Sequence, residues 1–415
     1  MSAKLREAIF NRRMLICIFT GFSSGLPLYI LISLLPAWLR SEQVDLKAIG
    51  LFALIQLPFT WKFIWSPLMD RFAWPHLGRR RGWMLVTQLA LLLSLPIFGW
   101  FEPQLDLWSI AYLAAAVAFF AASQDIVLDA FRREILLDVE LGLGNAIHVN
   151  AYRIAGLVPG SLSLILADHL PWSSVFWITA LFMLPGIIMT LMSGEPERAK
   201  GSPRTLREAV VEPFHEFITR AGWQQALLIL SFIFFYKLGD SMATALATPF
   251  YLDMGFSKTE IGLIAKHAGL WPAIIGGLLG GVWMLKLGIN RALWLFGVVQ
   301  AVSILGFALL AQNGHDLPLL AGVIGFEALG VGLGTTAFVA FIARATHPLY
   351  TATQFALFTS LSAVPRTLFN SATGYLVEQL GWVSFFLLCT LLALPGMLLL
   401  MKVAPWNGDF QGEKS

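Results

Sequence analysis

Long, uninterrupted runs of apolar residues alternate with short polar loops along this chain of 415 residues. A bilayer with a hydrocarbon core of about 30 Å needs roughly 20 apolar residues per helix, so each run is long enough to cross a membrane. The runs are continuous and do not alternate with polar residues, which favours helices over a β-barrel. The sequence therefore predicts twelve transmembrane helices, near residues 14–39, 49–69, 82–101, 107–131, 141–166, 172–192, 224–251, 260–286, 291–311, 317–343, 351–377 and 382–402.

The distribution of basic residues predicts the orientation of these helices. Lys and Arg cluster before the first helix and in every second loop, whereas the opposite loops hold little beyond Arg40, Lys47 and Lys258. Because cytoplasmic loops carry the excess of basic residues, we expect both termini in the cytoplasm. The first apolar run is too long for a signal peptide and no small-residue cleavage site follows it, so we expect it to remain as the first helix.

Composition narrows the class of protein further. Hydrophobic residues make up 57% of the chain and charged residues only 13%, as expected for an integral membrane protein. The formal charge of +3 follows from topology and does not indicate nucleic-acid binding. Cys17 and Cys389 lie in distant predicted helices and imply neither a disulfide nor a metal site. We expect no cofactor and no enzymatic activity, since the chain lacks metalloprotease spacing and a nucleophile elbow.

An internal repeat divides the predicted helices into two groups of six. Three motifs recur in the same order: Pro36-Ala37-Trp38-Leu39 as Pro249-Phe250-Tyr251-Leu252, Ile49-Gly50-Leu51 as Ile261-Gly262-Leu263, and Leu184-Pro185-Gly186 as Leu394-Pro395-Gly396. We therefore predict an all-α protein of two pseudo-symmetric six-helix bundles, residues 1–192 and 224–415, around a central cavity. Residues 193–223 are expected to join the bundles on the cytoplasmic face.

Acidic side chains inside apolar helices are candidates for proton coupling. Burying a charge at a helix centre costs about 2.5 to 3.5 kcal/mol on insertion scales, so such residues suggest a function. The candidates are Asp125, Asp240 and Glu327. Asp240 follows Lys237 at the i,i+3 spacing of a helix, and this pair is either structural or broken during transport by a proton or a substrate acid.

Other polar residues in the helices are candidates for contact with a substrate. His148, Tyr152 and Arg153 share a stripe on the fifth helix, where Arg153 suits an anionic group on the substrate. The alternative for Arg153 is an ion pair with an acid on another helix, and His148 alternatively is a satisfied polar group of the core. Further candidates from the second half are Tyr236, Lys237, Trp271, Gln354 and Arg366. Lys62 is expected to extend toward the membrane surface in a structural role.

Several motifs resemble those of known transporters. Asp70-Arg71 followed by Gly78-Arg79-Arg80-Arg81 resembles a loosened form of the signature loop of the major facilitator superfamily. More specific segments resemble the AmpG family of muropeptide permeases along nearly the whole chain: Gly21-Phe22-Ser23-Ser24-Gly25-Leu26-Pro27, Lys62 to Arg71, Ser123 to Ala130, Tyr236-Lys237-Leu238-Gly239-Asp240 and Ala352 to Leu357. The loop and the fourth helix supply the candidate gating residues Asp70, Arg71, Arg79, Asp129 and Arg132, with Asp129 expected to latch onto one of these arginines.

The resemblance implies proton-driven uptake by alternating access and leaves two substrates open. AmpG permeases typically carry additional C-terminal helices, whereas this chain ends soon after the twelfth, which resembles the RhtX/FptX branch of siderophore permeases. We therefore expect import of an iron-siderophore complex of the ferripyochelin type across the bacterial inner membrane, by a monomer that uses protons. The alternative is a muropeptide permease that takes up GlcNAc-anhydroMurNAc peptides for cell-wall recycling.

Overall fold

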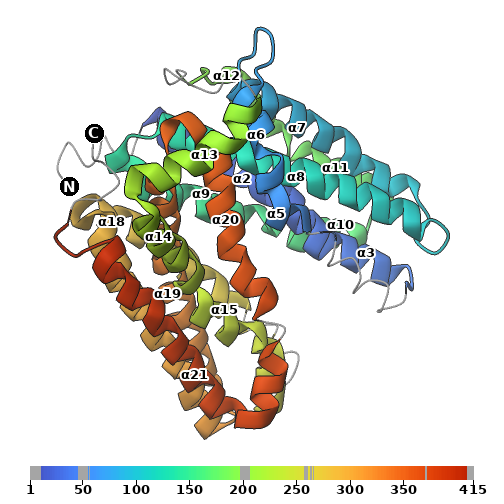
Figure 1. The fold of residues 1–415 in the computed structure, drawn as a ribbon. Coiled ribbons are helices and arrows are strands. Elements are labelled where there is room, and N and C mark those ends of the chain that lie inside the picture. Colours follow the sequence, from blue (N-terminus) through green and yellow to red (C-terminus); the bar gives the residue numbers. More distant parts are fainter. Residues whose placement is uncertain are drawn as a thin grey trace. The chain divides into compact units, whose positions relative to one another are not determined.

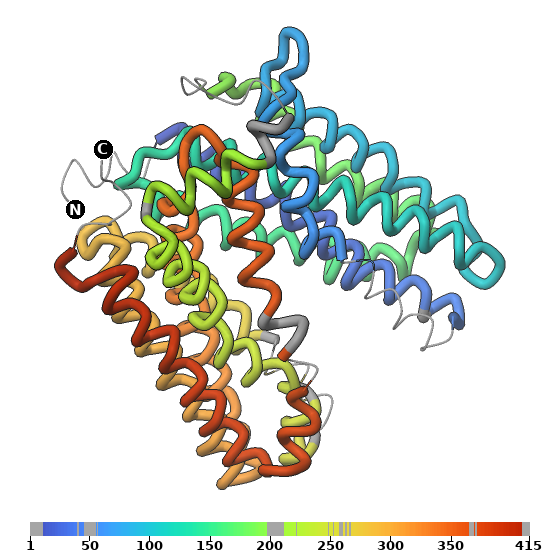
Figure 2. The backbone as a smooth tube through the Cα atoms, viewed as in Figure 1, coloured from blue at the N-terminus to red at the C-terminus, as the bar shows by residue number. Residues whose placement is uncertain are grey.

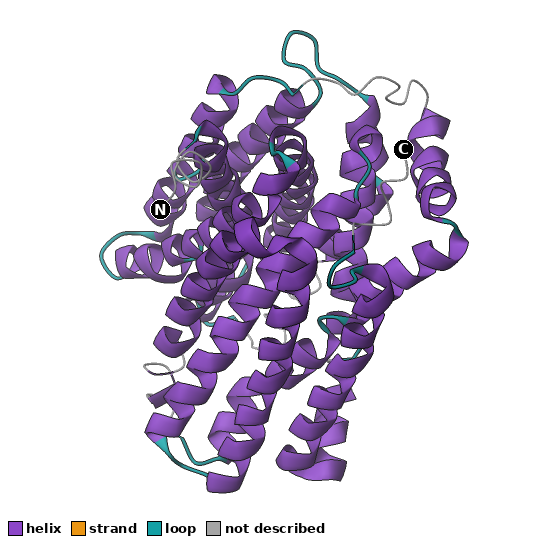
Figure 3. Ribbon diagram, turned by 90° about the vertical axis from the view of Figure 1, so that its left-hand side faces the viewer, coloured by secondary structure: helices purple, strands orange, loops and turns teal. Residues whose placement is uncertain are grey.

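A computed structural model describes residues 11–44, 55, 57–196, 206–256, 260–261, 264, 266–369 and 372–408. These residues form helices joined by short connections, and within these ranges the β-type pairing is confined to an isolated bridge between Trp74 and Gly78 (Figure 3). The predicted all-helical fold class is thus confirmed. Both termini, the Ile49-Gly50-Leu51 motif and the side chain of Arg366 lie outside what the structure describes.

Contacts divide the chain into two compact units. The first contains Met1–Leu136, Ile147–Pro213 and Thr346–Ser360, and the second contains Leu137–Ala146, Phe214–Ala345 and Leu361–Ser415. Residues 137–146 thus pack with helices that come much later in the sequence, and residues 346–360 with helices that come much earlier. The predicted division into two six-helix bundles, 1–192 and 224–415, joined by residues 193–223, does not include this exchange of segments and stays a prediction.

The first unit contains the helices of the first half of the chain (Figure 1). These are α2 (Arg12–Tyr29), η1 (Ile30–Leu34), α3 (Leu35–Ser41), α5 (Leu57–Trp61), η3 (Lys62–Ile64), α6 (Ser66–Arg71), α7 (Arg80–Ser94), η4 (Leu95–Trp100), α8 (Leu107–Ile135), most of α9 (Leu141–Ala155), η6 (Val158–Leu162), α10 (Ser163–Ala167), α11 (Trp172–Leu181), α12 (Leu184–Met192) and the start of α13 (Leu206–Ala221). It also holds η8 (Pro348–Tyr350) and the first turns of α20 (Thr351–Leu368).

The second unit contains α14 (Trp223–Phe235), α15 (Leu238–Ala245), α16 (Ala247–Asp253), α18 (Lys266–Asn313), α19 (Leu317–Ala345) and α21 (Thr373–Val403), together with η5 (Asp138–Glu140). The long helices α18, α19 and α21 lie side by side (Figure 2). Two of these runs each contain a turn at a glycine in the left-handed region, Gly288 (φ 73°) in α18 and Gly381 (φ 73°) in α21. Since L residues with side chains rarely adopt such angles, these glycines mark where one predicted helix ends and the next begins.

Each of the twelve predicted segments contains helix among its described residues. Nine helical runs among the described residues are long and apolar enough to cross a membrane by themselves. The run His267–Asn313 covers two predicted segments, joined at Gly288. The predicted second helix is described at residue 55 and from residue 57 onward, and none of the nine runs covers it.

Each repeated motif contributes an aromatic side chain to the core of its unit. Trp38 packs against Phe176 in the first unit with ring centroids 5.0 Å apart. In the second unit Phe250 packs against Phe386 at 4.8 Å, and it precedes Tyr251, the counterpart of Trp38. Such edge-to-face pairs favour one mutual arrangement of the helices, so the two motifs supply similar core pairs from positions one residue apart.

Prolines and glycines explain the local departures from regular α-helix. The π-turns η1 and η6 pack against each other in the first unit. Pro36 follows η1 and Pro159 lies within η6, and neither can donate a helical hydrogen bond to the carbonyl four residues earlier. Between α18 and α19, a Cβ atom added at Gly332 would lie 2.3 Å from the carbonyl oxygen of Ala273, so only glycine permits this close helix contact.

Candidate functional site

Two cations and two acids form a buried cluster in the first unit. Lys62 donates a hydrogen bond to Asp125 Oδ2, and its ammonium nitrogen lies 3.9 Å from Asp129 Oδ2. Arg132 Nη2 lies 2.7 Å from Asp129 Oδ1, and Ser24 Oγ donates to Asp125 Oδ1 at 2.7 Å. Charges taken out of water are tolerated when they are paired and hydrogen-bonded, and both conditions hold for these acids.

The local sequence places this cluster on one helix face. Asp125, Asp129 and Arg132 follow each other at i, i+4 and i+7 on α8, the spacing of one face of a helix. Lys62 meets this face from η3, and Trp65 Nε1 donates to Ser123 Oγ at 3.0 Å beside it. The expectation that Lys62 extends to the membrane surface is wrong, because its side chain turns inward to the two acids and the residue is only 4% exposed.

The predicted stripe on α9 faces α2. Thr20 Oγ1 lies 3.1 Å from His148 Nδ1, and the two helices touch so closely that a Cβ added at Gly21 would lie 2.1 Å from the carbonyl oxygen of His148. The ring of Tyr152 packs on that of Tyr29, with centroids 5.6 Å apart. His148 is thus buried with a polar partner, which favours the interpretation of a satisfied core histidine. The predicted substrate contact of the half-buried Arg153 stays a prediction.

A second charge network holds the start of α20. Asp70 Oδ2 accepts from the backbone nitrogen of Thr353 at 2.9 Å and from its hydroxyl at 2.8 Å, and Oδ1 accepts from the nitrogen of Ala352 at 3.3 Å. A carboxylate at the N-terminus of a helix both caps free N–H groups and complements the helix dipole. Asp70 therefore fastens a helix that begins 281 positions later, at Thr351, to the end of α6.

Glu134 and Arg80 complete this network, and neither was among the predicted gating residues. Arg80 Nη2 lies 2.8 Å from Asp70 Oδ1 and 2.6 Å from Glu134 Oε1. Glu134 also accepts from Thr351 Oγ1 at 2.5 Å and from Arg79 Nη2 at 3.1 Å. In the sequence, only the position of Glu134 directly after Arg132 and Arg133, at the end of α8, indicated that it could pair with an arginine.

The other predicted gating residues lie at different places. Arg79 takes part, with its guanidinium 3.8 Å from Asp70 Oδ1. Arg71 does not join this network in the described contacts, and its guanidinium instead lies over the ring of its neighbour Phe72. Arg132 pairs with Asp129 and also lies 5.8 Å from the ring centroid of Phe355 on α20. The buried acid cluster and the network at the start of α20 thus contact the same helix.

The central loop begins by capping α7. The carboxylate of Glu195 accepts hydrogen bonds from the backbone nitrogens of Arg79, Arg80 and Arg81 at 2.8, 2.8 and 2.9 Å. The preceding Gly78 has φ 87°, a conformation that favours glycine, and turns the chain into this helix. Two acids therefore bind the basic end of the signature loop: Asp70 contacts the side chains of Arg79 and Arg80, and Glu195 accepts from their backbone nitrogens.

The second unit contains the predicted pair of Lys237 and Asp240, with Nζ 3.0 Å from Oδ2. Tyr236 is buried and donates to the carbonyl of Leu293 at 3.0 Å, and its ring stacks on Phe338. Glu327 is buried in α19, whereas Trp271 is 53% exposed. The pairing that the i,i+3 spacing predicts is thus present, and the roles proposed for these residues in transport stay predictions.

Gln354, a predicted substrate contact, is buried at the start of α20, and its contact with a substrate stays a prediction. It is 1% exposed, its amide nitrogen donates to the carbonyl of Pro213 at 2.9 Å, and its amide oxygen accepts from His347 at 2.7 Å. Both ends of the amide are therefore engaged with backbone groups of the first unit. This geometry supports a structural role at the start of α20.

The second unit also has a cavity of about 520 Å³. It lies where Gly288, Asn290 and Arg291 meet Arg344 and the segment around Trp406. None of the candidate site residues lines it. In the described part of the chain, no group of three or more His, Cys, Asp or Glu side chains is placed to hold a metal ion.

Comparison with known proteins agrees with this architecture. A family model described as Major Facilitator Superfamily matches residues 17–369. The solved structure of FucP, a transporter of this superfamily in the outward conformation, covers 95% of this chain and 99% of its own, with a TM-score of 0.73 at 10% identity. The family match shows that the chain is a multi-pass secondary transporter and not an enzyme, and the solved structure shows the same fold.

Two relatives narrow the family. An uncharacterized protein of Haemophilus influenzae is 53% identical over 414 residues, covering 98% of this chain and 97% of that protein. The anhydromuropeptide permease of Escherichia coli K12 is 42% identical over 403 residues, covering 97% of this chain and 82% of the permease. The chain belongs to the AmpG-like permeases of the Major Facilitator Superfamily.

Proposed function

We propose that this protein is an inner-membrane permease that imports anhydromuropeptides, with both termini in the cytoplasm. The observation that carries this proposal is the 42% identity to the Escherichia coli anhydromuropeptide permease across 97% of the chain. The comparisons do not support the expectation of a siderophore permease. They favour the alternative, because a muropeptide permease aligns with 97% of this chain.

The buried cluster of the first unit supports proton coupling. Asp125 and Asp129 lie one turn apart on α8 and share two cations, Lys62 and Arg132. A proton bound by either acid would neutralise one of the two negative charges. One of the two cations would then be able to pair with another anion. A substrate carboxylate is such a partner, and anhydromuropeptides carry carboxylates on their peptides. Uptake of a proton and of an anionic substrate would thus stabilise each other.

The network at the start of α20 supports a gate. Arg132 lies over the ring of Phe355 on α20, whose first turn is held by Asp70 and Glu134. A change of charge at Asp129 therefore acts on Arg132, and through it on the helix that Asp70 fastens. We propose that this helix moves when the permease alternates between its two access states.

The test is uptake by purified protein in liposomes with an inward proton gradient. We expect saturable accumulation of labelled anhydromuropeptide that stops when an ionophore collapses the gradient. Iron-loaded pyochelin in the same vesicles serves as the control substrate. Entry of the iron complex without entry of the muropeptide would overturn the proposal and restore siderophore import.

A further inference from the structure

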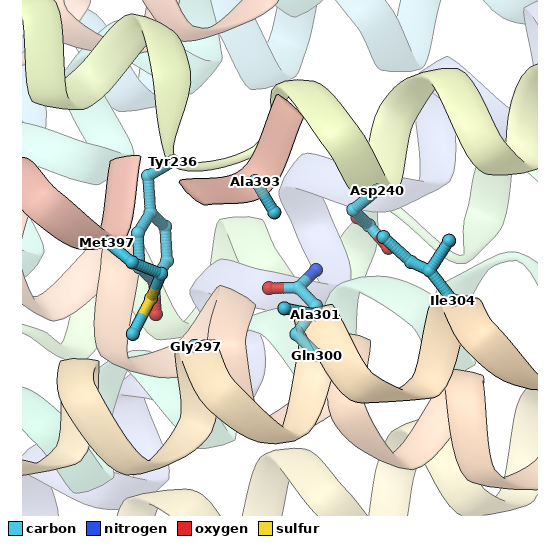
Figure 4. Close-up of a pocket in the computed structure, with 8 residues that line it drawn as sticks. All are labelled: Tyr236, Asp240, Gly297, Gln300, Ala301, Ile304, Ala393 and Met397. Atoms are coloured by element: carbon cyan, nitrogen blue, oxygen red, sulfur yellow. The ribbon is translucent and has the colours of Figure 1, made fainter. Parts of the chain in front are cut away.

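A cavity just large enough for one water molecule lies inside the second unit. Its volume is about 10 Å³, close to the minimum that a buried water needs. Tyr236, Asp240 and Gln300 line it together with apolar residues of α18 and α21 (Figure 4). It is distinct from the buried cluster of the first unit.

Two buried polar atoms at this cavity have no hydrogen-bond partner. These are Asp240 Oδ1, an acceptor, and Gln300 Nε2, a donor. Asp240 is 8% exposed and Gln300 4%, so bulk water does not satisfy them. Leaving a buried polar atom unsatisfied costs about 1 to 3 kcal/mol. Figure 4 shows the amide nitrogen of Gln300 on the side that faces Asp240, so one water between them would satisfy both atoms.

The internal repeat shows why this glutamine is left unsatisfied. Val86-Thr87-Gln88 recurs as Val298-Val299-Gln300, so Gln88 is the counterpart of Gln300. In the first unit, Gln88 Nε2 lies 3.4 Å from Ser23 Oγ, and its Oε1 accepts from Thr190 Oγ1 at 2.9 Å.

The counterparts of these two partners differ in the second unit. Under the shifts that relate Pro36 to Pro249 and Gly186 to Gly396, Ser23 corresponds to Tyr236 and Thr190 to Leu400. Tyr236 directs its hydroxyl to the carbonyl of Leu293, and leucine has no polar atom. The second half has thus retained the glutamine without its protein partners, beside an acid.

We propose that this cavity binds one water molecule and that Gln300 is a positioning residue for proton uptake at Asp240. The water accepts a hydrogen bond from Gln300 Nε2 and donates one to Asp240 Oδ1. A hydronium ion arriving at this position transfers one proton to Oδ1, which gives a neutral carboxylic acid and leaves the water in place. This inference deepens the proposed function and rests on it for its role in transport.

The charged and titratable groups around Asp240 fit this step. Lys237 lies 3.0 Å from Asp240 Oδ2, Tyr236 lines the same cavity, and Cys389 of α21 lies against the adjacent Gly239. The lining residues that α18 contributes carry no titratable side chain. Protonation of Asp240 removes the partner of Lys237, whose ammonium then becomes available to an anionic substrate.

The test separates proton-driven accumulation from exchange of substrate. In Gln300→Leu a side chain of similar size lacks the amide, so the water loses its donor. We expect accumulation of anhydromuropeptide under a proton gradient to fall about tenfold, which corresponds to roughly 1.4 kcal/mol. Counterflow at equal pH, which needs no net proton movement, should stay unchanged. Ser303→Ala is the matched control, because Ser303 lies one turn away, is buried, and donates only to the carbonyl of Gln300.

A second readout does not depend on transport. Infrared spectra of the purified protein at several pH values should contain a carboxylic-acid band that Asp240→Asn removes and Gln300→Leu shifts. An unshifted band, or wild-type accumulation by Gln300→Leu, would overturn the water site. If the wild-type protein moved no muropeptide while the band still shifted in Gln300→Leu, the proposed function would fail and the water site would stand.

Discussion

Among single residues, Lys62 is the one whose replacement we expect to change the stability of the protein most clearly. Its ammonium compensates Asp125 and lies near Asp129; Lys62 and Asp129 are buried, and Asp125 is partly buried. Replacing it by methionine keeps an unbranched side chain only one atom shorter, but leaves the two acids with one cation fewer. We expect Lys62→Met to lower the free energy of unfolding by about 3 to 5 kcal/mol, measured by thermal or denaturant unfolding in detergent.

The double variant Lys62→Met, Asp125→Leu is the control for this prediction. It removes the charge pair together and leaves Asp129 with Arg132, at 2.7 Å. We expect it to recover most of the lost stability, because burial of an apolar pair costs little compared with an unpaired charge. A double variant as unstable as the single one would show that the pair is not an energetic unit.

The candidate residues also show which ion pairs can be predicted from spacing along the sequence. The i,i+3 spacing of Lys237 and Asp240 predicts their ion pair, because both partners lie on one short stretch of chain. No local pattern joins Lys62 to Asp125, which are 63 positions apart and meet only because α8 packs beside η3. The partners of Asp70 on α20 likewise cannot be inferred from spacing, since Ala352 and Thr353 lie 282 and 283 positions away.

At the scale of elements, α20 depends on an acid from another helix. Its first turn has Asp70 as its cap, from α6. In Asp70→Asn the side chain keeps its size but loses the charge that complements the helix N-terminus and Arg80. We expect uptake to fall and the unfolding free energy to drop by about 1.5 to 3 kcal/mol, the range for hydrogen bonds to a charged group. Both are measured on the same purified protein.

Arg71→Gln is the matched control for this element. Arg71 is the next residue in the chain, but its guanidinium lies over Phe72 and makes no described contact with α20. We expect uptake and stability close to those of the wild type. Equal losses in Asp70→Asn and Arg71→Gln would instead indicate a general effect of charge in this loop.

At the scale of the whole molecule, each unit includes a segment from the other half of the sequence. Leu137–Ala146 belongs to the second unit and Thr346–Ser360 to the first. A chain divided between residues 197 and 205, in the central loop, should therefore yield two fragments that hold each other through these segments. We expect the two fragments to co-purify after co-expression, with one fragment tagged.

Disrupting one exchanged segment tests this expectation. A Cβ added at Gly142 would lie 2.8 Å from Met284 Cβ, so Gly142→Val should weaken the packing of residues 137–146 against α18. We expect less of the untagged fragment to co-purify with this substitution. Gly160→Val is the control, because a Cβ added there has no neighbour within 4 Å.

Local and periodic properties of the sequence predict the helical class, the places where helices form, the repeat and the AmpG-like family. These properties are apolar length, spacing along one helix and matching motifs. They did not predict the right branch of that family, since the comparisons do not support a siderophore permease. Which charges meet follows only from the packing of the helices. Lys62 turns inward to Asp125, Asp70 caps α20, and Gln300 faces a one-water cavity where Gln88 finds serine and threonine. The physical reason is that the stabilisation of a buried charge depends on distance in space, and segments far apart in sequence approach each other only when the helices pack.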